Sequence, residues 1–302
     1  MSRICTTVHR RFPDLTFIGL CHEVASLERY LPKMLDVSFE DLRLTSGGLN
    51  HFSCLLEAYY DSTDNDAYGD IRAKAPSFFA EVAGSSDFLR QSQSTGQMFD
   101  TEGQKDFHSL DIETAREWTE RTLFRFVLEQ FNLLPITTDS HFGEYLAWAY
   151  DIADHQGILD FYTYYKYRLC AVKPQLKLET KERVIPIIEA IIEDSGMHEA
   201  AVNIPNHGYI EELPRDIAVE VPARIGKTIT GQKLPQLPCA YAAILQNQIG
   251  IHHMTAEAVL SKSKQAVVQA LLVDPIVNCA KNIPQLVEVM CYTQRDYLGY
   301  LE

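Results

Sequence analysis

The chain has 302 residues, of which 46% are hydrophobic and 23% charged, a composition typical of a folded globular protein. Its formal net charge of −14 is unfavourable for binding to nucleic acid or to anionic membrane surfaces. No apolar run reaches the length of a membrane span, about 18 residues. The first residues contain no apolar region of the kind found in secretory signals, so we do not expect them to be one. The seven cysteines are scattered along the chain, and their odd number argues against a framework of disulfides. We therefore expect a cytoplasmic protein with reduced thiols.

The first part of the chain predicts a helix and a strand. Residues 2–10 fit a helix, and residues 15–20 form a short apolar run typical of a buried strand. Because a lone helix and strand cannot bury both of their faces, we interpret residues 1–20 as the last unit of a larger sheet. Apolar residues at helical spacing then predict a helix over 24–35.

A hairpin and a helix follow. Strands are predicted at residues 42–45 and 52–60, with a turn at 46–48 between them, and residues 64–82 are predicted to be helical. Residues 84–109 are rich in Gly, Ser and Gln and show little periodicity, so we expect a long loop there, either a lid or plain surface chain.

The second half is predicted to be mainly helical. Residues 111–132 carry one apolar face, and helices are also expected in 144–167, in 180–194 and from 240 to the end. One strand is predicted on each side of Pro222, over residues 217–221 and 223–229. Breaks in the last helical region are predicted at Gly250, Pro275 and Pro284. The predicted fold class is α+β with a majority of helix.

Two short segments place polar side chains next to predicted strands. Cys21 and His22 follow the run at 15–20, and residues at the carboxyl end of a strand often face a ligand. Asn50 and His51 stand at the mouth of the predicted hairpin. Either pair is also compatible with a purely structural role, but together Cys21 and His51 could bind one divalent metal ion with open coordination positions.

A third segment, residues 138–145, gathers two carboxylates and an imidazole at a predicted helix entrance. These groups are Asp139, His141 and Glu144. One interpretation is a helix start with an N-cap and a favourable acidic residue in the first turn. The other is a general base beside a histidine that binds sugar or assists a metal.

Two further segments have structural interpretations, and for the first of them a binding role explains the residues equally well. Residues 202–210 form an Asn- and Gly-containing turn whose side chains could also bind hydroxyl groups. His252 and His253 are predicted to open a surface helix that Thr255 caps.

The order of the polar segments resembles glycoside hydrolase family 4. The matching pieces are GLCHEV at 19–24, GGLNHF at 47–52, TDSHFGEY at 138–145 and VNIPNHGYIEELPRDIAVEVP at 202–222. Four pieces in the right order are far more specific than one, and they extend over nearly the whole chain.

The resemblance implies a fold and cofactors. It implies a helix-rich α+β domain like the carboxy-terminal domain of lactate and malate dehydrogenases. Residues 1–20 would be the end of an NAD-binding Rossmann domain, and residues 21–302 the metal- and substrate-binding domain. The cofactors implied are NAD and a divalent metal, usually Mn²⁺, in a cytoplasmic homo-oligomer.

The resemblance also implies a reaction. A small-molecule glycoside would be hydrolysed at its O-glycosyl bond through NAD-dependent oxidation at C3, metal-assisted removal of the C2 proton and elimination, unlike the usual two-carboxylate scheme. Cys21 and His51 fall on the family's metal ligands.

The remaining roles are carried over position by position. His22 is expected to contact the cofactor, and Asn50 and His141 the substrate. Asp139 lies where some members of the family carry the catalytic base. The DSHFGEY segment is closer to branches acting on unphosphorylated α-glucosides or α-galacturonides than to the phosphosugar branch.

One departure from the family pattern leaves alternatives open. No Gly-x-Gly-x-x-Gly follows a strand, so the NAD phosphate loop is missing from these residues. If the 302 residues were the whole protein, we would expect no family-type catalysis, and the chain would be a metal- or sugar-binding remnant or an oligomerisation module. A hydroxy-acid dehydrogenase is a third hypothesis, although such enzymes need no Cys–His metal pair.

Overall fold

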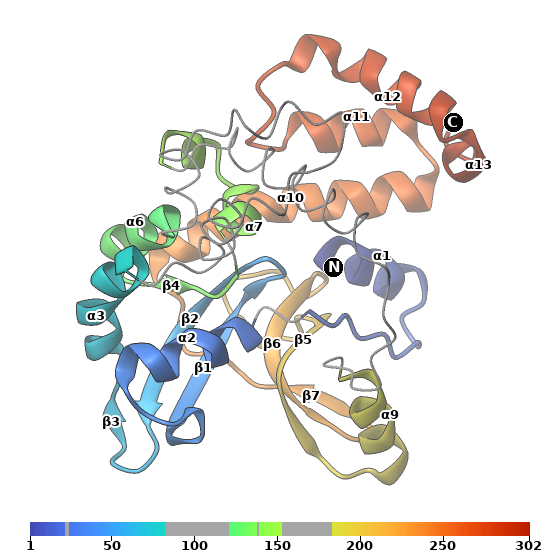
Figure 1. Cartoon of the computed structure of the whole chain (residues 1–302). Helices are drawn as coiled ribbons and strands as arrows, with labels where there is room; N and C mark the ends of the chain where they lie inside the picture. The colour runs from blue at the N-terminus through green and yellow to red at the C-terminus, as the bar shows by residue number, and fades with distance from the viewer. Residues whose placement is uncertain (22–23, 82–120, 138, 153–182) are drawn as a thin grey trace, which may run out of the picture.

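The structure, a computed structural model, describes residues 1–21, 24–81, 121–137, 139–152 and 183–302. The α+β class is confirmed, because an antiparallel sheet carries helices along its sides (Figure 1). The loop predicted at 84–109 lies outside the described residues, as do parts of the helical regions predicted at 111–132 and 144–167.

One seven-stranded sheet organises the described chain, and all its strand pairs are antiparallel. Its strands are β1 (Leu42–Leu49), β2 (Phe52–Tyr60), β3 (Asn65–Asp66), β4 (Leu134–Pro135), β5 (Met197–Pro205), β6 (Ala218–Ile225) and β7 (Ile229–Gly231). The order is β3-β2-β1-β6-β5, with β4 beside β2 and β7 beside β6. All residues of the central strand β6 are buried except Arg224.

The helices lie around this sheet. The α-helices are α1 (Ser2–Arg11), α2 (Ala25–Leu35), α3 (Tyr68–Glu81), α6 (Thr122–Phe131), α7 (Asp139–Gly143), α9 (Val184–Glu193), α10 (Cys239–Ser261), α11 (Lys264–Leu272), α12 (Ile283–Thr293) and α13 (Arg295–Leu298). Short 3₁₀ helices are η1 (Phe39–Asp41), η3 (Ala147–Asp151) and η4 (Ala280–Asn282). Figure 1 shows α10 running between the sheet and the outer pair α11 and α12, with α1 beside it. No helix in the described part of the chain is long and apolar enough to cross a membrane.

The hairpin of β1 and β2 is longer than predicted. The turn expected at 46–48 is part of β1, which pairs with β2 as far as Leu49 and Phe52. The two strands are joined by the two-residue turn Asn50-His51. The buried hydroxyl of Tyr241 on α10 lies 3.0 Å from Gly47 O and 2.9 Å from Phe52 O, so α10 fixes the end of the hairpin.

The prediction of two strands around Pro222 is wrong, because β6 runs through this residue. Proline has no N–H to donate, which normally excludes it from a central strand. The partner β5 shifts its register between Glu199 and Val202, directly opposite Pro222. This bulge removes the need for a ladder hydrogen bond there. Residues 202–205, predicted as part of a turn, belong to β5.

The predicted breaks in the last helical region are only partly correct. α10 continues through Gly250, although glycine is an unfavourable residue inside a helix. Pro284 lies in the first turn of α12, where no N–H is required. His252 is in the middle of α10 and is buried, so the surface prediction for it is wrong. Thr255 donates to Ile251 O instead of capping a helix.

The run at 15–20 is not a regular strand in the structure. Leu15 is exposed, and the segment meets the sheet through a single bridge between Gly19 and Asn203 of β5. The two backbone hydrogen bonds of this bridge measure 3.0 and 2.8 Å. The bridge places Cys21, two residues later, close to the edge of the sheet.

Candidate metal centre

His51 occupies the second position of the turn between β1 and β2 in an unusual backbone conformation. Its φ is 65°, in the left-handed region that glycine favours and that other residues rarely adopt. Such strain persists only where the surroundings hold it, and it is concentrated at functional sites. The turn thus projects an imidazole from the end of the hairpin at an energetic cost.

His141 and Glu144 reach the same place from α7 and the turn that follows it. Phe142, between them in sequence, is fully buried, and its ring lies 4.7 Å from that of Phe52 and 6.4 Å from that of Phe124. Burial of this aromatic ring anchors α7 on β2. The neighbouring polar side chains are consequently held at the open end of the hairpin.

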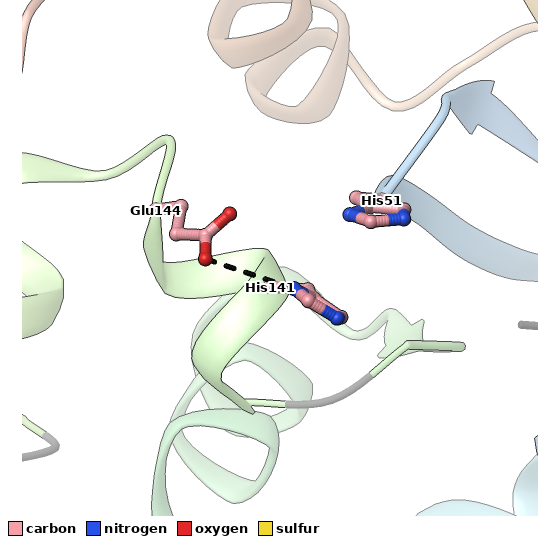
Figure 2. Close-up of side chains that lie close together, drawn as sticks. All are labelled: His51, His141 and Glu144. Carbon is pink, nitrogen blue, oxygen red and sulfur yellow. Dashed lines mark ion pairs between the residues drawn. The ribbon is translucent and has the colours of Figure 1, made fainter. Parts of the chain in front are cut away.

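His51, His141 and Glu144 form a cluster, which Figure 2 shows in close-up. The imidazole rings of His51 and His141 are 4.3 Å apart between centroids, and His141 Nδ1 lies 3.6 Å from Glu144 Oε1. One ligand atom of each residue lies within 4.8 Å of those of the other two. Within the described ranges, this is the only group of three or more His, Cys, Asp or Glu residues so arranged.

The electrostatic environment keeps His51 neutral. Burial, with a smaller contribution from His141, lowers the pKa of His51 to about 4, and Glu144 opposes the shift only weakly. A neutral imidazole has a lone pair available for a metal ion near neutral pH.

The donor set of this cluster fits a divalent transition metal. Two imidazoles and one carboxylate are ligands for ions such as Mn²⁺, Fe²⁺ and Zn²⁺. Three protein donors leave coordination positions for substrate oxygens, as a catalytic ion requires.

The sequence-predicted metal ligands are only partly brought together. His51 lies in the cluster, whereas half-buried Cys21 is not a member of it. The cluster adds His141, which the sequence had suggested as a sugar-binding or metal-assisting residue. It also adds Glu144, one of the two carboxylates of the same segment, which the sequence had not suggested as a metal ligand. The ligand role of Cys21 stays a prediction.

The other predicted site residues have different surroundings. His22 and the side chain of Asp139 lie outside what the structure describes, although Asp139 begins α7. Asn50 is buried, and its amide nitrogen donates to Glu220 Oε2 over 3.0 Å. Tyr145 Oη donates to Asn50 O over 3.3 Å, so the turn is held from both sides.

The sequence did not assign a role at the metal centre to two residues of this region, Glu144 and Glu220. Glu144 could have been found from its spacing of three from His141, which places both on one face of a helical turn. Glu220 could have been found as a carboxyl in the middle of the apolar strand β6.

Comparisons with known proteins agree with the resemblance in sequence. The family 4 glycosyl hydrolase C-terminal domain matches residues 46–277. An α-glucosidase from Erwinia rhapontici is 53% identical over all of this chain and 67% of its own length. An α-galacturonidase from Thermoanaerobacterium saccharolyticum is 23% identical over 99% of this chain and 64% of its own length.

A solved structure shares the fold. The crystal structure of a 6-phospho-α-glucosidase from gut microorganisms, in complex with NAD and Mn²⁺, matches 97% of this chain and 64% of its own, with a TM-score of 0.67 and 20% identity. The chain therefore spans about two thirds of the length of these proteins. On the domain match and the 53% identity, the chain belongs to glycoside hydrolase family 4.

Proposed function

We propose that this protein is a glycosidase that hydrolyses α-glucosides with NAD and a divalent metal as cofactors. The observation that carries the proposal is the cluster of His51, His141 and Glu144 in a chain 53% identical to an α-glucosidase. The structural neighbour that binds NAD and Mn²⁺ supports the choice of cofactors.

The chain's own side chains divide the work in this proposal. His51, His141 and Glu144 would hold the metal, with Cys21 as the further ligand that the sequence predicts. The metal would act as a Lewis acid on the sugar oxygens, while NAD would accept a hydride from C3.

The remaining roles concern proton transfer and orientation. Asp139 would remove the proton at C2, because it begins the helix that carries His141. The side-chain amide of Asn50 donates to Glu220, and its backbone carbonyl accepts from Tyr145. Asn50 would therefore orient the substrate from a rigid turn. His22 would contact the cofactor.

A homo-oligomer is part of the proposal. α12 and α13 expose large apolar side chains, with Tyr292 and Tyr297 at 74% and 79% exposure. Such surfaces are typical of contacts between subunits. Light scattering over a range of concentrations would test this, and a strictly monomeric mass would contradict it.

The activity test is release of 4-nitrophenol from its α-glucoside by this chain joined to a family 4 NAD-binding domain, with NAD⁺, Mn²⁺ and a thiol reductant supplied. We expect turnover that disappears when either NAD⁺ is omitted or the metal is chelated. A substrate deuterated at C2 should react more slowly, because the proposed route breaks that C–H bond. Turnover that is unaffected by chelation would contradict the proposal.

Metal binding separates the proposal from its alternative. A chain that binds Mn²⁺ at His51 but hydrolyses no glycoside under these conditions would be the non-catalytic binding module considered from sequence. Oxidation of a hydroxy acid without metal would instead favour a dehydrogenase.

A further inference from the structure

Glu220 is a buried carboxyl that lies behind the candidate metal centre. It is 2% exposed and belongs to the central strand β6. Its Oε2 accepts hydrogen bonds from two side-chain amides, Asn50 Nδ2 at 3.0 Å and Asn203 Nδ2 at 3.1 Å. Both asparagines are themselves buried.

These two amides belong to the two segments that lead to the predicted metal ligands. Asn50 precedes His51 in the hairpin turn. Asn203 forms the bridge to Gly19, two residues before Cys21. One carboxyl oxygen therefore links the turn that carries His51 to the segment that carries Cys21.

A second contact closes the network. Ser2 Oγ accepts from the backbone N–H of Asn50 at 2.9 Å and donates to Asn203 Oδ1 at 3.3 Å. Ser2 is also buried. Both asparagines are thus fixed on two sides, and Glu220 is the only acidic member of this set.

Burial of a carboxyl group at this position destabilises the fold unless the group is well hydrogen-bonded. Burial raises the pKa of Glu220, and the hydrogen bonds from Asn50 and Asn203 oppose this shift. A well-packed apolar residue in a central strand is often at least as stable as a buried acid. Stability alone therefore does not account for Glu220, whereas the need to hold two amides at one point does.

We propose that Glu220 is a positioning residue, whose carboxyl sets the relative position of the Asn50-His51 turn and the Gly19–Cys21 segment for metal binding. This inference rests on the proposed function, since it assigns a support to the same metal centre. Glu220 acts through Asn50 and Asn203, and the proposal requires no contact between Glu220 and the metal or the substrate.

The test compares three substitutions in the full chain. Glu220→Met keeps much of the side-chain volume but removes both acceptor oxygens. Glu220→Gln keeps one oxygen that can accept from both asparagines. Glu199→Gln is the matched control, since Glu199 is a buried acid of the same sheet that pairs with Arg183.

Two readouts are used, the dissociation constant for Mn²⁺ from its EPR signal and the imidazole NMR signals of His51, assigned with a His51 variant. We expect Glu220→Met to weaken Mn²⁺ binding at least about tenfold and to shift the His51 signals. Glu220→Gln should restore binding to within about threefold of wild type, and Glu199→Gln should change neither readout. If Glu220→Met does not fold, Glu220→Asp replaces it, because a carboxyl shorter by one methylene cannot reach both amides.

The outcomes distinguish this inference from the proposed function. Unchanged Mn²⁺ affinity in folded Glu220→Met, or in folded Glu220→Asp where it takes its place, overturns the positioning role. If the wild-type chain binds no Mn²⁺, the metal centre itself fails, and the His51 signals decide alone. Unchanged His51 signals in Glu220→Met, or in Glu220→Asp where it takes its place, would then overturn the inference. His51 signals that shift in this variant, but not in Glu220→Gln or Glu199→Gln, would support it.

Discussion

Gly48→Ala tests how tightly the end of the β1–β2 hairpin is packed. Gly48 has a φ of 151°, which side-chain-bearing residues rarely adopt, and an added Cβ would overlap Tyr241 Oη and lie 2.7 Å from Phe52 O. The backbone strain costs about 1–3 kcal/mol, and the overpacking costs about 1–3 kcal/mol more. We therefore expect a loss of about 2–6 kcal/mol in the free energy of unfolding, measured by urea denaturation.

Two companion variants make this prediction specific. Gly250→Ala in α10 is the matched control, because nothing lies within 4 Å of its added Cβ, and it should stabilise the protein by about 0.5–1 kcal/mol. Gly48→Ala combined with Tyr241→Phe should lose less than the sum of the single variants, since the overlapping oxygen is gone. A loss below about 1 kcal/mol for Gly48→Ala, or strict additivity with Tyr241→Phe, would refute the packing described for the hairpin.

Four further predictions concern separate parts of the molecule. Glu144→Gln should weaken Mn²⁺ binding by about tenfold in an EPR titration, and unchanged affinity would remove Glu144 from the site. Burial lowers the pKa of His252 to about 3, below its unfolded value near 6.5, so the unfolded chain takes up the proton first and stability falls as the pH drops through this window. Replacing His252 by Leu should reduce that slope by up to about 1.4 kcal/mol per pH unit in urea denaturation, and an identical slope would contradict it. Asn206→Ala removes a buried amide that contacts three carbonyls at 2.8–3.0 Å, and we expect calorimetry to show a loss of about 2–4 kcal/mol. Ser263→Ala removes the cap that accepts from Ala266 N at 3.2 Å and should cost about 1 kcal/mol, whereas an unchanged melting temperature would show that the cap is dispensable.

Helices with clear periodicity were predicted well from the sequence, and strands with unusual residues were not. The buried positions Leu27, Leu31 and Met34 follow helical spacing, so α2 was found nearly to its ends. β6 was divided at Pro222 because a local rule about proline was applied without knowledge of the bulge in its partner. Proline is accepted inside β6 because of how β5 pairs with it, and this pairing depends on residues that are far apart in sequence.

The same distinction holds for the candidate site. The turn carrying His51 and the helix start carrying His141 were both selected as polar segments, but 90 positions separate them in sequence. Burial of Phe142 against Phe52 brings them together, and no local pattern predicts that contact. The hydrogen bonds of Glu220 were missed for a similar reason, because its partners Asn50 and Asn203 come from the β1–β2 turn and from β5.

The central claim is that His51 stands at a divalent metal site. The most direct measurement is an EPR titration of Mn²⁺ into the wild-type chain and into His51→Gly. Glycine suits the φ of 65° at this position, so the variant should keep or gain stability while losing the ligand. We predict one bound Mn²⁺ per wild-type chain and an affinity at least about 100-fold weaker in His51→Gly. Equal affinity in the two folded proteins, or no Mn²⁺ binding by the wild-type chain, would contradict the claim.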